Sequence, residues 1–340
     1  MTDLSTSFAG LKLKNPVIIG SSGLTNSIKD IMELEKNGAA AVVLKSLFEE
    51  EIIREMQATY SSMSSEGFIY PETLEFYEHE DKTEESTIKY LDLIAKTKKE
   101  VTIPVIASIN CLTASQWTYF PRQVEGAGAD AVELNIFILP SDLNRTAREN
   151  EKTYHDIIHE VLKSIKIPVI VKLSYYFSNL ASFLQGISKT GIKGLVLFNR
   201  FYNPDFDLNT LNVTSGAVLS SPSDLFLSLR WIAIMAERVS CDLAASTGVH
   251  DGKAMVKQLL AGAHAVEIAS ALYKYGNARI GEMLSEVKDW MKNKGYSSIQ
   301  DFRGKLSQAK SSDPAAYERV QFMKYFRGYQ KDQRQPDNGH

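Results

Sequence analysis

The amino-acid sequence predicts an α/β chain folded as a (β/α)8 TIM barrel, with insertions after the second and sixth strands. Eight short runs rich in Val, Ile and Ala recur along the chain, and each precedes a segment of helical character. Near-continuous hydrophobicity is typical of parallel strands covered on both faces, and eight strand–helix repeats favour a closed barrel over an open sheet. The runs are "PVIIGSS", "AAVVLKS", "IPVIASIN", "ADAVELN", "IPVIVKLS", "KGLVLFN", "CDLAAST" and "HAVEIAS".

The segments between the runs support this alternation. Helical periodicity covers residues 27–37, 179–190, 223–239 and 252–261. Residues 48–85 and 200–222 are too long for ordinary connections, and both follow strand C-termini, where barrel enzymes build their active sites. No linker composition divides residues 1–311, so we expect a single barrel domain followed by a polar tail over residues 312–340.

Composition narrows the class of protein. The chain has 340 residues, of which 44% are hydrophobic and 23% charged, as in soluble globular proteins. A net charge of −3 provides no basic surface for nucleic acid, and no apolar run is long enough to span a membrane. Cys111 and Cys241 lack metal-ligand spacing, so we expect no metal site and no disulfide framework. The N-terminus does not resemble a signal peptide, and the composition predicts a cytoplasmic protein.

Polar and small residues stand at the ends of the predicted strands, where a barrel would bring them to one pocket. They are Ser21, Ser22, Gly23, Lys45, Ser46, Asn110, Glu133, Asn135, Lys172, Ser174, Asn199, Ser246, Thr247, Gly248, Ala269 and Ser270. Lys45 and Lys172 each end an apolar run, and a buried lysine needs a partner because desolvation depresses its pKa. Either these lysines reach solvent or pair with Glu133, or they face an electron-rich ligand beside the asparagines.

The last two strand ends indicate what such a ligand carries. In "ASTGVHDGKA", Thr247 and Gly248 precede a predicted helix, and in "EIASALYKYG", Ala269 and Ser270 precede another helical turn. Small residues let backbone N–H groups approach an anion, and the loops after strands 7 and 8 are the usual phosphate site of this barrel. A phosphate there and a ring beside the lysines describe a mononucleotide such as FMN; a simple tight turn is the alternative.

These residues resemble those of a known family, the dihydroorotate dehydrogenases, and especially its cytosolic fumarate-linked branch. The similarity runs from about residue 4 to residue 305. It is carried by "FAGLKLKNPVIIGSSG", "NGAAAVVLKS", "ADAVELN", "IPVIVKLSYYF", "ASTGVHDGKAMVKQLLAGAHAVEIASALYKYG" and "MKNKGYSSIQDFRGKL". The resemblance implies a flavoprotein oxidoreductase acting on CH–CH groups in pyrimidine biosynthesis, with FMN as cofactor, a small-molecule substrate and a homodimeric assembly.

Carried over residue by residue, the resemblance implies FMN at the mouth of the barrel. The flavin ring or its substrate would contact Ser22, Gly23, Lys45, Ser46, Asn110, Asn135, Lys172 and Asn199, and the phosphate would contact Thr247, Gly248, Ala269 and Ser270. Lys172 would stabilise negative charge at the N1/O2 end of the ring, and Lys45 would lie between flavin and substrate.

The chain departs from the family where a base should remove the substrate proton. The family follows its strand asparagine with a short polar loop holding Cys or Ser and then Pro-Asn, whereas this chain reads "NIFILPSDLN". Counting from Asn135 places Ile138 at the base position, and aligning on Pro140 places Leu139 there. Neither accepts a proton, although general-base catalysis typically contributes roughly 10²–10⁴-fold in rate. We therefore expect an altered substrate and a hydrophobic lid over the flavin, formed by this apolar run.

Two further departures concern the substrate. Residues 48–85 lack the family's substrate-clamping motif, and Arg200 follows Asn199 where the family has a small hydroxyl residue. Arg200 is a candidate for binding a substrate carboxylate or phosphate; the alternative is an ion pair with Asp205 or Asp207 that holds the loop. Lys45, Arg200 and Cys111, which ends the third strand, are the candidate catalytic residues, and a buried structural role is the alternative for the cysteine.

Three functions are consistent with these residues. The leading one is an FMN-dependent oxidoreductase with an unknown substrate. The second is a true dihydroorotate dehydrogenase that converts dihydroorotate to orotate with a different base. The third is a flavin-binding protein that has lost catalysis.

Overall fold

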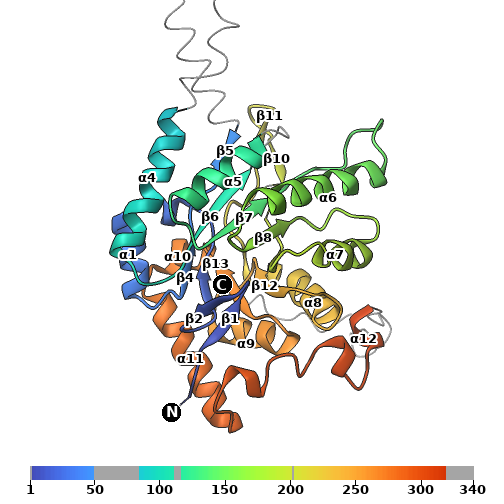
Figure 1. Ribbon diagram of the computed structural model, residues 1–340. Helices are drawn as coiled ribbons and strands as arrows, with labels where there is room; N and C mark the ends of the chain where they lie inside the picture. The colour runs from blue at the N-terminus through green and yellow to red at the C-terminus, as the bar shows by residue number, and fades with distance from the viewer. Residues whose placement is uncertain (1, 50–83, 111–115, 201–202, 319–340) are drawn as a thin grey trace, which may run out of the picture.

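The eight apolar runs form a closed parallel barrel in the computed structural model, which describes residues 2–49, 84–110, 116–200 and 203–318 (Figure 1). The barrel strands are β3 (Val17–Ile19), β4 (Ala41–Val43), β6 (Val105–Asn110), β7 (Ala131–Asn135), β8 (Val169–Leu173), β9 (Gly194–Leu197), β12 (Asp242–Ser246) and β13 (Ala265–Ile268). They pair in chain order, with β13 beside β3. A short strand, β5 (Leu47–Phe48), lies along β6. The predicted (β/α)8 barrel is confirmed.

Helices surround the barrel (Figure 1). They are α1 (Ile28–Lys36), α4 (Glu84–Glu100), α5 (Gln116–Gly126), α6 (Ala147–Ser164), α7 (Leu180–Ser188), α8 (Leu225–Met235), α9 (Gly252–Ala261), α10 (Ser270–Tyr275), α11 (Arg279–Lys294) and α12 (Ala315–Glu318), with short 3-10 turns at Gly23–Thr25, Pro222–Asp224, Ile299–Asp301 and Gln308–Lys310. The side chains of Ser27, Asn179 and Asp251 accept backbone N–H groups at the first turns of α1, α7 and α9. These caps explain why the helices begin close to their predicted starts.

Two hydrophobic cores stabilise the barrel. Side chains that point outward pack beneath the helices, and those that point inward form a smaller separate core. The hairpin of β1 (Thr6–Phe8) and β2 (Leu11–Leu13) contributes Phe8 and Leu13 to this inner core, at the N-terminal end of the strands. Gly194 allows the close approach, because a Cβ atom there would lie 2.8 Å from the Phe8 ring.

The inner face of the barrel changes from apolar to polar toward the strand C-termini. Successive strand residues alternate between faces, so a residue two positions after an inner-core residue also points inward. The residues two positions after Ile106, Ala131, Ile170 and Ala265 of the inner core are Ser108, Glu133, Lys172 and Glu267. All four are buried. The barrel therefore holds one ammonium, two carboxyl groups and a hydroxyl just below the face where its active site is expected.

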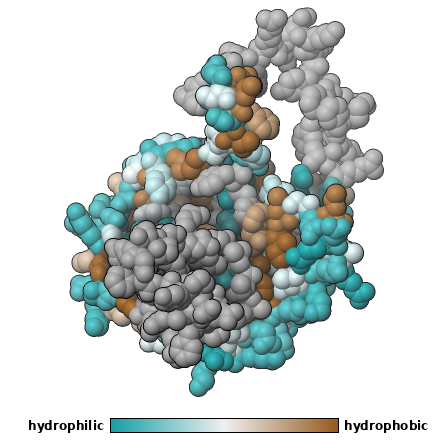
Figure 2. Space-filling model, turned by 90° about the horizontal axis from the view of Figure 1, so that it is seen from above, coloured by the Kyte–Doolittle hydropathy of each residue, from teal (hydrophilic) through white to brown (hydrophobic). Residues whose placement is uncertain are grey.

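The insertion after the sixth strand folds into an antiparallel hairpin of β10 (Pro204–Asp207) and β11 (Asn212–Ser215). In the tail, α12 packs against the body of the protein, with the Tyr317 hydroxyl donating to the Leu306 carbonyl oxygen at 2.8 Å. Most of the insertion after the second strand lies outside the described residues. Over the described ranges, no helix has the length and apolar character needed to cross a bilayer. Seen from above, hydrophilic side chains cover most of the lower and right-hand edge of the molecule, and hydrophobic side chains gather right of the centre and on the projecting upper part (Figure 2).

Candidate active site

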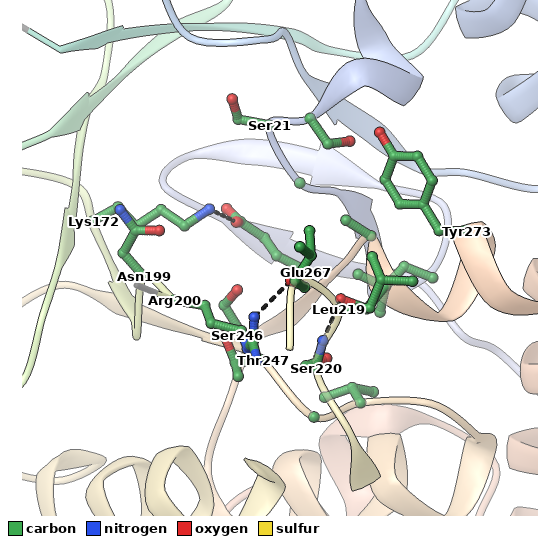
Figure 3. Close-up of a pocket in the computed structure, with 18 of the residues that line it drawn as sticks. Ser21, Lys172, Asn199, Arg200, Leu219, Ser220, Ser246, Thr247, Glu267 and Tyr273 are labelled. Carbon is green, nitrogen blue, oxygen red and sulfur yellow. Dashed lines mark hydrogen bonds and ion pairs between the residues drawn. The ribbon is translucent and has the colours of Figure 1, made fainter. Parts of the chain in front are cut away.

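A cavity of about 480 Å³ lies at the C-terminal ends of the barrel strands (Figure 3). Such a volume falls within the range of roughly 300–1,000 Å³ that is usual for cofactor and small-molecule sites. Of the predicted site residues, the cavity brings together Ser22, Gly23, Lys172, Asn199, Arg200, Thr247, Gly248, Ala269 and Ser270. Strand ends far apart in the sequence thus meet in one site, as the barrel prediction requires.

Ser21 and Ser246, two further strand-end residues, also line the cavity, whereas the remaining predicted residues that the structure describes do not. Asn135 lies next to it, since its Oδ1 accepts a hydrogen bond from Asn199 Nδ2 at 2.6 Å. Lys45 and Ser46 line a neighbouring cavity of about 560 Å³. Asn110 ends β6 beside β5, outside the cavity wall. Cys111 lies outside the described residues, so its catalytic role stays a prediction.

A chain of hydroxyl groups ties Ser46 to the cavity wall. The Ser46 hydroxyl lies 3.0 Å from that of Ser21, which lines the cavity, and 2.8 Å from that of Ser108. The Ser46 backbone N–H also donates to Ser21 Oγ at 2.9 Å. These bonds fix the ends of β3, β4 and β6 relative to one another. Ser46 therefore positions the wall rather than lining it.

The predicted phosphate loops line the same cavity as Lys172. Thr247 and Gly248 both have positive φ angles, 74° and 82°, and a Cβ atom on Gly248 would lie 2.2 Å from the backbone nitrogen of Leu225. Glycine is therefore required at this turn because of both its backbone conformation and the close contact. On the opposite wall, a Cβ atom on Gly23 would lie 2.8 Å from the Tyr273 hydroxyl, so that glycine leaves room for the phenol.

A polar cluster holds the segment that forms a third wall. The Ser220 N–H donates to Ser270 Oγ at 3.0 Å, and the Ser220 carbonyl accepts from Lys274 Nζ at 2.8 Å. The Ser220 hydroxyl lies 3.0 Å from His250 Nε2. Burial, with the nearby Lys274 charge, lowers the pKa of His250, so the imidazole is neutral near pH 7. This cluster anchors the segment beside one of the predicted phosphate loops.

The Arg200 side chain is hydrogen-bonded within the insertion that follows β9, to which it belongs. Its guanidinium donates to the carbonyl oxygens of Val218 at 2.6 Å and Ala217 at 2.7 Å. The expected partners were Asp205 or Asp207, and neither pairs with it. Asp207 instead accepts backbone N–H groups of the hairpin turn, because these lie closest to its carboxylate. The ion pair with Asp205 or Asp207 is therefore not formed, and the guanidinium, which lines the cavity, instead holds the loop through two backbone carbonyl oxygens.

Lys172 pairs with two buried carboxyl groups at the floor of the cavity. Its Nζ lies 2.6 Å from Glu267 Oε2 and 3.5 Å from Glu133 Oε1, and the three residues are 7%, 3% and 0% exposed. Pairing with Glu133 was one of the alternatives for this lysine, and Glu267 is a closer partner that sequence reasoning missed. Figure 3 shows Lys172 and Glu267 pointing toward one another. The sequence did contain an indication that Glu267 is a site residue, because it is the single acidic residue in the apolar run "HAVEIAS".

The charges of these groups follow from their burial. Desolvation alone would lower the pKa of Lys172, but attraction to Glu133 and Glu267 raises it above its usual range, so the ammonium stays charged. Burial, followed by repulsion from Glu267, raises the pKa of Glu133 well above its usual range. A permanent cation at the cavity floor thus lies beside a carboxyl group, that of Glu133, whose pKa is raised.

The apolar run after β7 does not form the expected lid. None of residues 136–139 lines the cavity; Ile136 is buried and Ile138 packs against the outer core. The Ile138 N–H donates to the hydroxyl of Tyr154 of α6 at 3.1 Å, and burial raises the pKa of this phenol to about 12. Apolar side chains gain more from this core than from a polar cavity, and the hydrogen bond holds the loop there.

A second cavity of about 240 Å³ adjoins the first and shares Asn199, Arg200, Ser246 and Thr247 with it. Its other walls include Tyr175, Tyr176, Phe198 and Leu227. The rings of Tyr175 and Tyr176 lie 4.6 Å apart. This compartment offers aromatic faces beside the polar floor of the main cavity.

Comparison with known proteins identifies the family. The family model described as dihydroorotate dehydrogenase matches residues 3–291. Among curated relatives, the dihydroorotate dehydrogenase B (NAD(+)) catalytic subunit of Thermoplasma volcanium is 26% identical over 313 residues, 89% of this chain and 98% of the relative. That of Thermoplasma acidophilum is 27% identical over 311 residues, 89% of this chain and 99% of the relative.

A relative whose name contains "dihydroorotate dehydrogenase A (fumarate)", from Aeropyrum pernix, is 25% identical over 313 residues, 90% of this chain and 98% of the relative. Relatives named for either electron acceptor therefore match at similar identity, and the likeness is to the family as a whole rather than to one branch. With the family model covering most of the chain and the barrel placing the strand-end residues around one cavity, this chain belongs to the dihydroorotate dehydrogenase family.

Proposed function

We propose that this protein is an FMN-dependent oxidoreductase whose substrate is not dihydroorotate. The observation that carries the proposal is the main cavity itself. The Lys172 side chain and the turns at Thr247–Gly248 and Ala269–Ser270 all line it. A family member needs these two features to hold a flavin ring and its phosphate in a single site.

The described residues fit this cofactor. At the floor, Glu267 Oε1 is buried and has no hydrogen-bond partner among the described groups, and the Lys172 ammonium lies beside it. An acceptor next to a cationic donor suits the edge of a ring that carries both N–H and C=O groups. FMN, when bound, would supply the two-electron acceptor. Lys172 and Glu267 would hold the ring edge, and the two turns would hold the phosphate.

The loop after β7 supports a substrate other than dihydroorotate. Ile138 and Leu139, at the position of the family's base, carry no group that accepts a proton, and Ile138 packs in the outer core. Beside the main cavity, Tyr175, Tyr176 and Phe198 line the second compartment. Aromatic walls favour a planar or partly apolar molecule over a small, highly polar one.

The absorbance spectrum of the purified protein tests the cofactor. We expect flavin bands in the native protein and FMN in the supernatant after denaturation. A colourless protein that also fails to take up added FMN would contradict the proposal.

We also propose, on the family resemblance, that the protein is a homodimer. Sedimentation equilibrium measures this directly.

Anaerobic mixing with dihydroorotate tests the substrate. We expect flavin bleaching to be at least roughly 10²-fold slower than in a family member that has the base, because general-base catalysis contributes about that much or more. Reduction by dithionite is the control that shows a competent flavin. Rapid bleaching with formation of orotate would instead favour the second function, a dihydroorotate dehydrogenase with a different base.

A further inference from the structure

We propose that Glu133 and Glu267 form a proton-accepting pair around Lys172, which takes up one proton when negative charge develops in the cavity. Uptake neutralises the counterion of Lys172 and leaves its ammonium free to face the new charge. The inference rests on the proposed function only for the source of that charge, a reduced flavin. The resting state of the pair is a property of the protein alone.

The geometry makes the three groups one unit. Lys172 on β8 reaches Glu133 on the neighbouring strand β7 at 3.5 Å and Glu267 on the more distant strand β13 at 2.6 Å. Glu267 and Lys172 line the cavity, whereas Glu133 lies behind them. With both carboxyl groups ionised, this buried unit would carry one uncompensated negative charge, which is costly in a low-dielectric interior.

The missing hydrogen bonds of Glu133 indicate where one proton resides. Neither carboxyl oxygen of Glu133 receives a hydrogen bond from the described residues, although the side chain is fully buried. A proton on Glu133 turns an acceptor without a donor into a donor, and the adjacent Glu267 carboxylate is its acceptor. The pKa of Glu133, raised by burial and then by Glu267, agrees with this assignment. At rest the unit is neutral, with a charged lysine, one carboxylate and one carboxylic acid.

Two serines and a tyrosine border the pair. Ser108 of β6 and Ser246 of β12 lie opposite Glu133 and Glu267 in the strand pairing, and both are neutral. Tyr90 of α4 is the other titratable group that interacts with Glu133. Its hydroxyl is bonded to the backbone of Ser108, and burial, with the Glu133 charge, raises its pKa, so it stays protonated.

Negative charge in the cavity would add to the charge already on Glu267. Glu267 then gains an O–H bond, with a proton drawn from solvent through the cavity that it lines. Both carboxyl groups are then neutral, and the Lys172 ammonium is uncompensated. One proton enters the protein, and the external reductant supplies the electrons, so charge and atoms balance.

Infrared spectra of the flavin-free protein, recorded as the difference between H2O and D2O buffers, test the protonation of the carboxyl pair at rest. We expect one carboxylic-acid C=O band near neutral pH, sensitive to deuterium, in the wild type. The band should disappear in Glu133→Gln and remain in Asp156→Asn, which removes an exposed carboxylate that pairs with Lys152. A wild-type spectrum without this band would overturn the proposal, whether or not the protein binds FMN.

The midpoint potential of the bound flavin tests the uptake. Each proton bound in a two-electron reduction shifts the potential by about 30 mV per pH unit. We expect about 59 mV per pH unit in the wild type, where the flavin and the pair each take one proton, and about 30 mV in a Glu133→Gln, Glu267→Gln double variant. Equal slopes in the two proteins would overturn the proposal. A slope of about 30 mV per pH unit in the wild type would also overturn it, and that result does not depend on whether the variant folds.

Discussion

Replacing Glu133 with glutamine should stabilise the flavin-free protein, by an amount that grows with pH. Burial, and then repulsion from Glu267, holds the pKa of this carboxyl well above its usual range. Folded protein therefore keeps a proton that the unfolded chain releases. The stability contributed by such a group is fully present below its unfolded pKa and is lost as pH rises toward the folded pKa. Glutamine does not titrate, so the stability of the variant does not fall with pH for this reason.

The size of the effect follows from the number of protons. A difference of one bound proton changes the free energy of unfolding by about 1.4 kcal/mol per pH unit. The pH range in which the wild type loses this stability begins at the unfolded pKa of about 4.3 and ends at the raised pKa of Glu133 in the folded protein. Between about pH 5 and pH 6, we expect the difference between variant and wild type to widen by about 1.4 kcal/mol, the slope for one proton.

Urea unfolding followed by circular dichroism at a series of pH values measures this difference. Glu149→Gln is the matched control. Glu149 is an exposed carboxylate in the cap of α6, and hydrogen bonds from Thr146 lower its pKa. Above pH 5 it is ionised in both states, so its variant should show a constant offset. If the Glu133 variant also shows a constant offset, Glu133 is not protonated in the folded protein, and the charge assignment of the cavity floor is refuted.

Three further changes test the site and its supports. Lys172→Met should weaken FMN binding by roughly tenfold to a hundredfold, the value of a charge-assisted hydrogen bond, in a fluorescence titration; equal affinity would contradict its placement beside the ring. Gly248→Ala should destabilise the protein by about 3 kcal/mol or more. The control is Gly10→Ala, at a glycine with the same φ of 82° but open space around it, which should cost about 1–2 kcal/mol; equal thermal shifts would rule out the close contact. Tyr154→Phe should cost about 1 kcal/mol by removing the partner of the half-buried loop amide of Ile138, and an unchanged melting temperature would count against that bond.

The sequence alone predicted the features that depend on local periodicity. Each barrel strand lies within an apolar run, because a strand covered on both faces needs consecutive apolar residues. The helix predicted at residues 252–261 has those bounds in the structure, since Asp251 caps its start and Gly262 follows its end. The strand-end position of Lys172 also followed from its run. These signals lie within a few residues of the feature that they predict.

Only the tertiary structure decided which groups meet. Glu267, the closest partner of Lys172, lies 95 residues away along the chain, and no local pattern joins the two. Likewise, the side chains of Ile136 and Ile138 could face either the cavity or the helices, and both pack with the outer core beneath the helices, whereas Leu139 is half exposed. Periodicity shows which side of a strand a residue occupies. The partners of a buried charge depend on barrel closure, which brings distant strand ends within hydrogen-bond distance.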